Sequence, residues 1–581
     1  MNKRIIILAL LASSCMSFAQ RIVDPVPSKD QIKLQDMEMY AFLHYSLNTY
    51  TGQEWGYGNE DVKLFNPSDL DVRQWVRTCK AAGMKGVIFT AKHHCGFCMW
   101  PSEYTDYSVK SSPWKDGKGD VVRELADACK EYGLKFAVYL SPWDRNHAEY
   151  GREEYVTYFR NQLRELLTNY GDVFEVWFDG ANGGNGWYGG TNETRRIDRL
   201  TYYQWDDTYS MIRELQPHCV IWNDGANRRG DLRWVGTEAG NIGQRNWSLM
   251  SSTKDPEYED LHFGMENGDV WCPGETNTSI RPGWFYHETE DTQVKSLSKL
   301  MDTYYRSVGR NSTLLLNFPI MPNGLISPID SARGAAFADM VHRIFDNDLA
   351  QGIKPKKKGD NTYILDFKKP VTFSRFMVCE DITRGQRVKK FTVEVLADGV
   401  WMPLQDELAD QGDGLETIGR KRIICFPEVT ATSLRLTVTD TKAKPVISRM
   451  SVFYAPDINA DIPNSGEKLS TRYNVTVTGA NGSPSRSIMI DLKGTRKVKG
   501  FRYLPPQRQG ARGIITHYSL WAMTDNEWKR ISEGEFSNIV NNPIWQSVNI
   551  SPVSSSLLRI DAESMNAGER VAYEDIEILT E

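Results

Sequence analysis

Between residues 40 and 345, short apolar segments alternate with longer segments in which apolar residues recur every three or four positions. The short segments have the length and β-branched content of strands, and the longer ones have the period of amphipathic helices. The predicted strands are Phe42–Leu47, Gly86–Ala91, Lys135–Leu140, Phe174–Phe178, Cys219–Asn223, Leu232–Gly236 and Leu314–Phe318. Alternating strands and helices indicate βα units around a parallel sheet. Because no early glycine-rich phosphate loop is present, we predict a (β/α)8-like TIM barrel rather than an open sheet.

Helix signals fall between these strands. The predicted helices are Asp71–Ala82, Asp120–Tyr132, Tyr155–Tyr170, Tyr203–Leu215 and Asp291–Val308. Asp120 is a candidate N-cap, and the candidate C-cap glycines are Gly83, Gly133, Gly171 and Gly309. These boundaries place the ends of successive strands at one face of the barrel.

The pattern changes near residue 345, where helical periodicity stops and alternating, strand-length segments begin. The segment Gln351–Lys358 is predicted to be one exposed linker and Pro456–Ser470 a second. The segments Phe391–Trp401 and Tyr518–Trp528 match in alternation, turn and closing Trp, which indicates a duplicated unit. The chain is therefore predicted to combine an α/β region with all-β regions: a catalytic barrel over residues 20–349 and two β-sandwiches over residues 350–457 and 468–581.

The N-terminus has the charge and length pattern of an export signal. Met1–Arg4 is basic, Ile5–Ala12 is apolar but too short to span a membrane, and Ser17–Ala19 has the form of a cleavage site. We predict a signal peptide over residues 1–19 and export to the periplasm or the cell surface. An imperfect lipoprotein box ending at Cys15 makes lipid anchoring the weaker alternative. No later segment is long and apolar enough to predict a transmembrane helix.

Net charge and cysteine usage narrow the function classes. The chain carries a formal charge of −6, with basic residues scattered along it, so no nucleic-acid or anionic-lipid partner is predicted. Eight cysteines remain after residue 19, and their wide spacing favours isolated buried thiols over a disulfide framework. Cys95 and Cys98 form a CxxC pair, but no second Cys pair lies beside it, so a metal or redox role is disfavoured.

Polar and aromatic residues concentrate at the predicted strand ends, where catalytic side chains of barrels lie. They are His44, Glu54, Trp55, His93, His94, Trp177, Asp179, Glu238, Glu275 and Trp284. Imidazole and carboxyl groups bind hydroxyls and indole rings cover C–H faces, so this set predicts a pocket for a neutral sugar. Asp179 ends an apolar strand and is the candidate nucleophile, and we expect the nearby histidines to keep it ionised.

Structural interpretations of these residues remain open at this point. An Asp before a Gly is often a turn or N-cap residue, and Trp177 and Trp284 could be core residues. His93 and His94 could bind zinc, although consecutive strand residues point to opposite faces, so no metal is predicted. What favours a functional site is that candidates occur at several successive strand ends.

These residues belong to blocks that resemble a known family, glycoside hydrolase family 29, the α-L-fucosidases, over residues 36 to 345. The blocks are Thr90–Pro101, Trp177–Gly180, Trp234–Gly240 and Arg281–His287, in the family's order. The segments Thr51–Gly56 and Trp234–Gly240 are similar to the branch that prefers α-1,3/1,4-linked fucose on Lewis-type glycans. The segment Phe501–Ile515 resembles discoidin-like (factor 5/8 type C) sandwiches, some of which bind carbohydrate.

The resemblance implies an exo-acting retaining α-L-fucosidase that needs no cofactor and no catalytic metal. It makes Asp179 the nucleophile and Glu238 the general acid/base, with Glu275 as the alternative acid. It implies that fucose is held by His44, Glu54, Trp55, His93, His94, Trp177 and Trp284. The expected partner is a fucosylated oligosaccharide or glycoconjugate.

The chain departs from the family at Cys95, where an Asp is usual, and this puts the tuning of the neighbouring histidines in question. Two other functions stay open from the sequence: another exo-glycosidase on the same barrel, and a catalytically inactive surface protein that binds glycans. The pattern predicts no oligomeric state.

Overall fold

The computed structural model describes residues 22–181, 183–223, 230–409, 414–456, 474–478, 485–506, 511–536, 539–540 and 543–580. The predicted signal peptide lies outside these residues and stays a prediction, as does the predicted export. In the described part of the chain, no helix is both long enough and apolar enough to cross a membrane.

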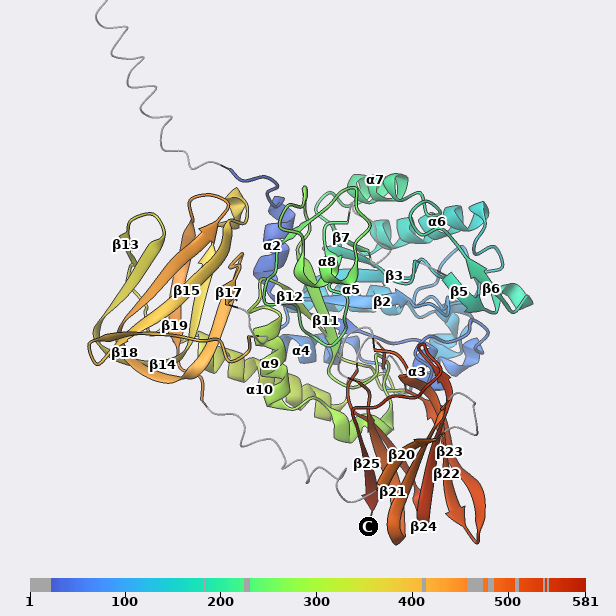
Figure 1. Ribbon diagram of the computed structural model, residues 1–581. Coiled ribbons are helices and arrows are strands. Elements are labelled where there is room, and N and C mark those ends of the chain that lie inside the picture. The colour runs from blue at the N-terminus through green and yellow to red at the C-terminus, as the bar shows by residue number, and fades with distance from the viewer. Residues whose placement is uncertain are drawn as a thin grey trace, which may run out of the picture.

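Eight parallel strands form a nearly closed barrel in the N-terminal region (Figure 1). In spatial order they are β7 (Val220–Asn223), β4 (Glu175–Phe178), β3 (Lys135–Leu140), β2 (Gly86–Lys92), β1 (Met39–Leu43), β12 (Thr313–Asn317), β11 (Gly274–Ser279) and β8 (Arg233–Trp234). A parallel bridge between Trp222 and Leu232 joins the two ends of this sheet. The predicted TIM-like barrel is confirmed.

Apart from α2, which precedes β1, the helices follow strands, and most of them cover the outside of the barrel (Figure 1). They are α2 (Lys29–Met37), α3 (Asn48–Thr51), α4 (Val72–Ala81), α5 (Val121–Tyr132), α6 (Glu153–Asn169), α7 (Trp205–Leu215), α8 (Tyr258–Phe263), α9 (Leu297–Arg306) and α10 (Pro328–Phe345). Asp120 caps α5 as predicted, because its side chain accepts a hydrogen bond from the Arg123 amide at 2.8 Å.

Three sequence predictions need correction. The eighth strand, β11, was missed because Gly274–Ser279 contains no apolar residue, although all six residues are buried. The first strand begins at Met39 and ends at Leu43, so His44 lies just beyond it. The helix predicted from Asp291 begins at Leu297, because Ser296 caps it by accepting from the Lys299 amide; the 3-10 turn η6 (Glu288–Gln293) precedes it.

Two antiparallel domains follow the barrel. The first contains β13 (Lys356–Lys358), β14 (Thr362–Glu380), β15 (Val388–Ala397), β16 (Val400–Pro403), β17 (Leu415–Glu416), β18 (Arg422–Thr441) and β19 (Ile447–Phe453). The second contains β20 (Asn474–Thr478), β21 (Ser487–Leu504), β22 (Ile515–Thr524), β23 (Glu527–Glu535), β24 (Gln546–Met565) and β25 (Asp575–Thr580). Each domain has its own apolar core, and its longest strands pass through register shifts.

The two domains share one strand order. The first follows β13-β14-β18-β15-β16 with β19 beside β14, and the second follows β20-β21-β24-β22-β23 with β25 beside β21. The two segments matched in the sequence form equivalent hairpins, β15–β16 and β22–β23. The structure therefore agrees with a duplicated sandwich.

Both sandwiches contact the barrel, at different places (Figure 1). Backbone hydrogen bonds join the first to it, from Asn311 N to Lys421 O at 2.9 Å and from Ile423 N to Gly309 O at 2.9 Å. The second packs β24 against η6 and lies near α3. Since α3 and η6 flank segments that carry candidate site residues, the second sandwich lies on the functional side of the barrel.

Candidate active site

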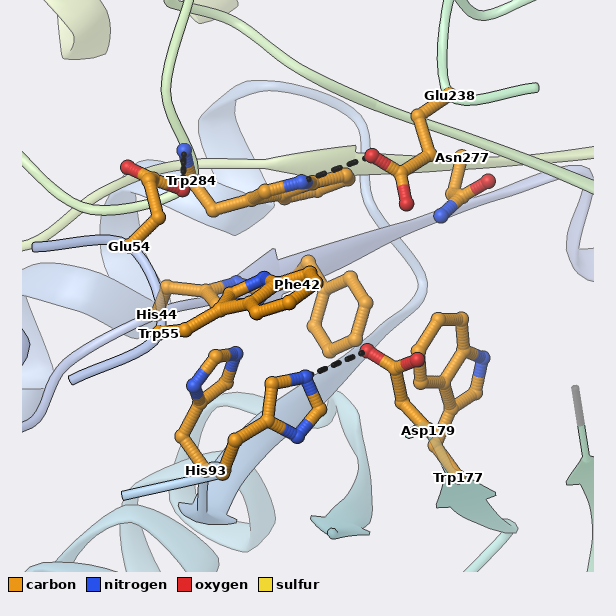
Figure 2. A pocket seen from close by; sticks show the side chains of 11 residues that line it. Phe42, His44, Glu54, Trp55, His93, Trp177, Asp179, Glu238, Asn277 and Trp284 are labelled. Atoms are coloured by element: carbon orange, nitrogen blue, oxygen red, sulfur yellow. Dashed lines mark hydrogen bonds and ion pairs between the residues drawn. The ribbon is translucent and has the colours of Figure 1, made fainter. Parts of the chain in front are cut away.

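One pocket collects nearly all of the predicted site residues at the carboxyl ends of the barrel strands (Figure 2). It encloses about 490 Å³, including its open mouth. Its lining consists of Phe42, His44, Glu54, Trp55, His93, His94, Trp177, Asp179, Glu238, Asn277 and Trp284. Of the predicted residues, only Glu275 is absent from this lining, whereas Phe42 and Asn277 were not predicted.

Asp179 directly follows β4 and is held firmly. The Tyr139 hydroxyl donates to Asp179 Oδ2 at 3.0 Å, and the Ser141 hydroxyl donates to the Asp179 backbone carbonyl at 3.2 Å. His94 Nε2 lies 3.7 Å from the same Oδ2 atom. Its side chain is 32% exposed, so the carboxyl is both oriented and open to the pocket.

The three histidines of the pocket are neutral at pH 7. Burial lowers the pKa of His44 to about 3 and that of His94 to about 4, and it lowers the pKa of His93 well below the usual range. His44 Nδ1 pairs with Asn317 Oδ1 at 2.9 Å, and His94 Nδ1 pairs with Ser141 Oγ at 2.8 Å. Desolvation outweighs the attraction of Asp179 for His94, so these histidines act on Asp179 as neutral groups, and the expectation that they keep it ionised stays a prediction.

Glu238 comes from the segment after β8 and faces the pocket from the wall opposite Asp179 (Figure 2). The indole Nε1 of Trp284 donates to Glu238 Oε2 at 3.1 Å. The carboxyl is half-buried. An indole donor fixes the direction of this carboxyl while leaving it access to the pocket.

Glu54 holds the segment that carries Trp284. Its Oε2 accepts from the Trp284 amide at 2.9 Å and its Oε1 from the Phe285 amide at 3.2 Å. His287 Nε2 lies 3.4 Å from Oε1. The Glu54 carboxyl therefore positions Trp284, and through it Glu238.

Glu275 lies beneath the pocket. It is completely buried, its Oε1 accepts from the Trp177 indole at 2.7 Å, and its Oε2 accepts from the Tyr40 hydroxyl. Beside it lies Glu175, whose pKa burial and the charge of Glu275 raise well above the usual range. Burial also raises the pKa of Glu275. Glu275 supports the pocket floor because it holds the indole of Trp177. Trp177 in turn stacks on Trp222, with ring centres 3.5 Å apart.

Cys95 lies behind the histidines rather than in the pocket. It is fully buried, and its sulfur lies 3.6 Å from Ser46 Oγ. Burial, with a contribution from the charge of Glu60, raises its pKa to about 12, so the thiol is neutral. All eight cysteines from Cys79 to Cys425 are free and buried, which confirms the prediction of isolated thiols.

Two observations define the chemistry open to this pocket. Within the described ranges, no group of three or more His, Cys, Asp or Glu side chains is placed to hold a metal ion. Asp179 and Glu238 instead present carboxyls from two walls, between indole faces and neutral imidazoles. Such a set is typical of sites that bind a neutral pyranose and act at its anomeric carbon through two carboxyl groups.

Sequence reasoning missed the residues that contribute to the pocket from within the strands. Phe42 lies in β1 and Tyr139 in β3, where they look like core residues, and Asn277 lies in the unrecognised β11. Tyr139 is the most informative omission, because it donates directly to Asp179. Tyr139 lies near the end of β3, which pairs with β4, and this position could have marked it as a site residue.

Comparisons with known proteins agree on the family of the barrel. A family model described as Alpha-L-fucosidase matches residues 25–343, and one described as F5/8 type C domain matches residues 463–574. Alpha-L-fucosidase 1 of Arabidopsis thaliana is 39% identical over 74% of this chain and 87% of its own.

Two solved structures extend this agreement. That of a glycoside hydrolase 29 family member from an unknown rumen bacterium is 62% identical, covers 97% of this chain and 100% of its own, and has a TM-score of 0.76. That of a Ruminococcus gnavus GH29 fucosidase in complex with fucose is 29% identical, covers 76% of this chain and 97% of its own, and has a TM-score of 0.67.

Proposed function

We propose a residue-level mechanism from the premise that the chain belongs to the α-L-fucosidase family, glycoside hydrolase family 29, and is an enzyme of that family. In this proposal Asp179 is the nucleophile and Glu238 the general acid/base of a retaining reaction, which is typical of the family. The observation that carries the proposal is that both carboxyls open into one pocket from different walls, whereas Glu275 is buried below it.

The reaction proceeds in two displacements. Asp179 attacks the anomeric carbon of fucose, the glycosidic C–O bond breaks, and Glu238 gives its proton to the departing oxygen. Glu238, now a carboxylate, takes a proton from water, whose oxygen attacks the anomeric carbon and releases Asp179. Carboxyls that act in this way stand about 5–5.5 Å apart in retaining enzymes.

We assign fucose binding to the other predicted residues of the pocket. The imidazoles of His44, His93 and His94 are neutral and can both donate to and accept from sugar hydroxyls. Trp55, Trp177 and Trp284 supply apolar faces for ring C–H groups and the methyl group. The complex of the related R. gnavus GH29 fucosidase with fucose supports fucose as the sugar that this pocket binds.

Azide rescue separates the roles of the three carboxyls. With an aryl α-L-fucoside, whose phenolate leaves without a proton, turnover by Glu238→Ala falls by about 10²–10⁴, and azide restores it by attacking the fucosyl-enzyme, which gives α-fucosyl azide with retention. In Asp179→Gly, azide attacks the substrate and gives β-fucosyl azide with inversion. Retained azide product from Glu275→Ala, with none from Glu238→Ala, would reverse the acid assignment.

We further propose that the substrate is α-1,3/1,4-linked fucose on a Lewis-type glycan, handled after export to the periplasm or cell surface. The motifs around Glu54 and Glu238 support this linkage, and the basic and apolar N-terminus supports export. Product analysis with Lewis-a, Lewis-x and 2′-fucosyllactose side by side tests the linkage. Faster release from 2′-fucosyllactose would contradict it, and activity confined to the cytoplasmic fraction would contradict export.

A further inference from the structure

The second sandwich lies against the segment that positions the acid/base candidate. Its strand β24 packs on η6, which begins directly after His287. In Figure 1 its barrel-facing end lies near α3, whose last residue Thr51 precedes the Glu54 and Trp55 segment by two residues. The sandwich therefore adjoins the mouth of the pocket, not the rear of the barrel.

Glu535 is the charged residue at this end of the sandwich. It ends β23, and its side chain is 38% exposed. Its Oε2 lies 3.8 Å from Nε2 of the cross-strand residue His517, which is 53% exposed. His517 Nδ1 in turn pairs with Ser564 Oγ at 2.7 Å. Glu535 is thus oriented by its own domain and still open to solvent.

Barrel residues at the pocket mouth act electrostatically on Glu535. Burial raises its pKa, as does the charge of Glu54, while His517, His287 and Arg145 act in the opposite direction. In the other direction, burial lowers the pKa of His287, but hydrogen bonding to Glu54 and the charges of acidic neighbours, Glu535 among them, raise it overall. These mutual effects place Glu535 within electrostatic range of Glu54 and His287.

The same neighbours flank Trp55. Glu54 precedes it, and Gly56, which follows it, accepts a hydrogen bond from the Arg145 guanidinium. Trp55 lines the pocket, and its ring lies edge-on to those of His94 and Trp143, yet it is 53% exposed. An exposed indole and a partly exposed carboxylate at one pocket mouth provide a stacking face and a hydroxyl acceptor, the two elements of a pyranose site.

The sandwich lacks such a platform of its own in the described chain. Among its described residues, Val540 is the one exposed large apolar side chain. Its three Trp residues lie under guanidinium groups, Trp521 and Trp528 under Arg559 and Trp545 under Arg502. The R. gnavus fucosidase matches this chain over 97% of its own length but only 76% of this one, so it has no counterpart to about a quarter of this chain. A domain without such a platform of its own, placed at the pocket mouth, suits a shared site.

We propose that the second sandwich and the barrel rim together form a binding position for the sugar that leaves. Trp55, which lines the fucose pocket and is still half exposed, also stacks on this second sugar, and Glu535, oriented by His517, accepts hydrogen bonds from its hydroxyls. The inference rests on the proposed function, since a leaving sugar exists only if the pocket cleaves a fucoside. It assigns the C-terminal domain a part in selecting the glycan that carries the fucose.

Glu535→Gln tests the proposal, with Glu527→Gln as the matched control. Glu527 begins the same strand, eight residues from Glu535, about 26 Å along β23. Steady-state kinetics use a Lewis trisaccharide, and inhibition constants are measured for free fucose and for the defucosylated disaccharide. We expect Glu535→Gln to lower kcat/KM about tenfold by raising KM. The inhibition constant of the disaccharide should rise about tenfold, while the inhibition constant of fucose stays unchanged. Glu527→Gln should match the wild type throughout.

The outcomes separate the inference from the function beneath it. If the wild type releases fucose and Glu535→Gln does so with unchanged kcat/KM, the shared site is refuted and the function stands. If the inhibition constants of fucose and of the disaccharide rise equally in Glu535→Gln, the residue acts on the fucose pocket and the shared site is again refuted. If the wild type cleaves no fucoside, the proposed function itself fails.

Discussion

Replacing Trp284 by Phe tests the link between the indole and the acid/base candidate. The change removes the Nε1–H that donates to Glu238 at 3.1 Å but keeps an aromatic ring beside His44, whose ring centre lies 5.1 Å away. A donor to a carboxyl stabilises its charged form, so losing it raises the pKa of Glu238. Such a bond contributes about 1.5–3 kcal/mol. Because Glu238 is half-buried, we expect the lower value, equal to about one pH unit.

The assay is the pH profile of kcat/KM, whose alkaline limb reports the pKa of the acid in the free enzyme. We expect Trp284→Phe to move this limb upward by about one unit. Trp55→Phe is the matched control, since it also changes a pocket indole but not one that bonds to Glu238; it should alter KM without moving the limb. An alkaline limb that stays in place in Trp284→Phe, or that moves equally in both variants, would refute the assignment of Glu238 as the acid.

Three further substitutions test the support of the pocket. Lys92→Met removes the buried partner of Asp144, whose carboxyl lies 3.1 Å from the Lys92 ammonium group. The free energy of unfolding, measured in urea, should fall by about 3–5 kcal/mol, and adding Asp144→Asn should restore part of it. A loss below about 1 kcal/mol would contradict this expectation. Glu175 has a raised pKa in the folded protein, so its contribution to stability is full below about pH 4.3 and declines as pH rises, by at most about 1.4 kcal/mol per unit. Denaturant titrations at several pH values should therefore show a flatter profile for Glu175→Gln, and a steeper one would be inconsistent with a buried neutral carboxyl. Cys95→Asp places a second carboxyl near Glu60 and should lower the melting temperature, with recovery in the double variant with Glu60→Gln; equal melting temperatures of both variants would exclude this repulsion.

The sequence predicted the pocket lining well because its residues combine two independent signals. Residues such as Asp179 and His94 are polar or aromatic, and they also fall directly after apolar strands, where a barrel brings them together. Glu238 and Trp284 lie in longer connections, where the strand-end pattern only listed them among the candidates and the family resemblance gave Glu238 its role. The resemblance therefore contributed most where the chain is least regular.

The features that the sequence did not reveal are those in which polar residues are buried. The strand β11 carries Glu275, Asn277 and four other residues without a single apolar side chain, so no period could mark it as a strand. Its polar groups are stabilised by tertiary partners, such as Trp177 and Tyr40 for Glu275. The burial that keeps the histidines neutral depends on packing between several strands, which a linear pattern does not encode.

The neutrality of the histidines has a consequence for the design of inhibitors. In the described chain the pocket lining contains three carboxyl groups, from Glu54, Asp179 and Glu238, and neither Lys nor Arg to balance them. Positive charge that develops on the sugar ring at the transition state therefore meets carboxyl groups, Asp179 foremost, and no cation in the pocket lining. A fucose-shaped piperidine with a protonated nitrogen at the anomeric position would carry that charge permanently. Such amines should bind more tightly than the natural sugar, and neutral lactams of the same shape should lose this advantage.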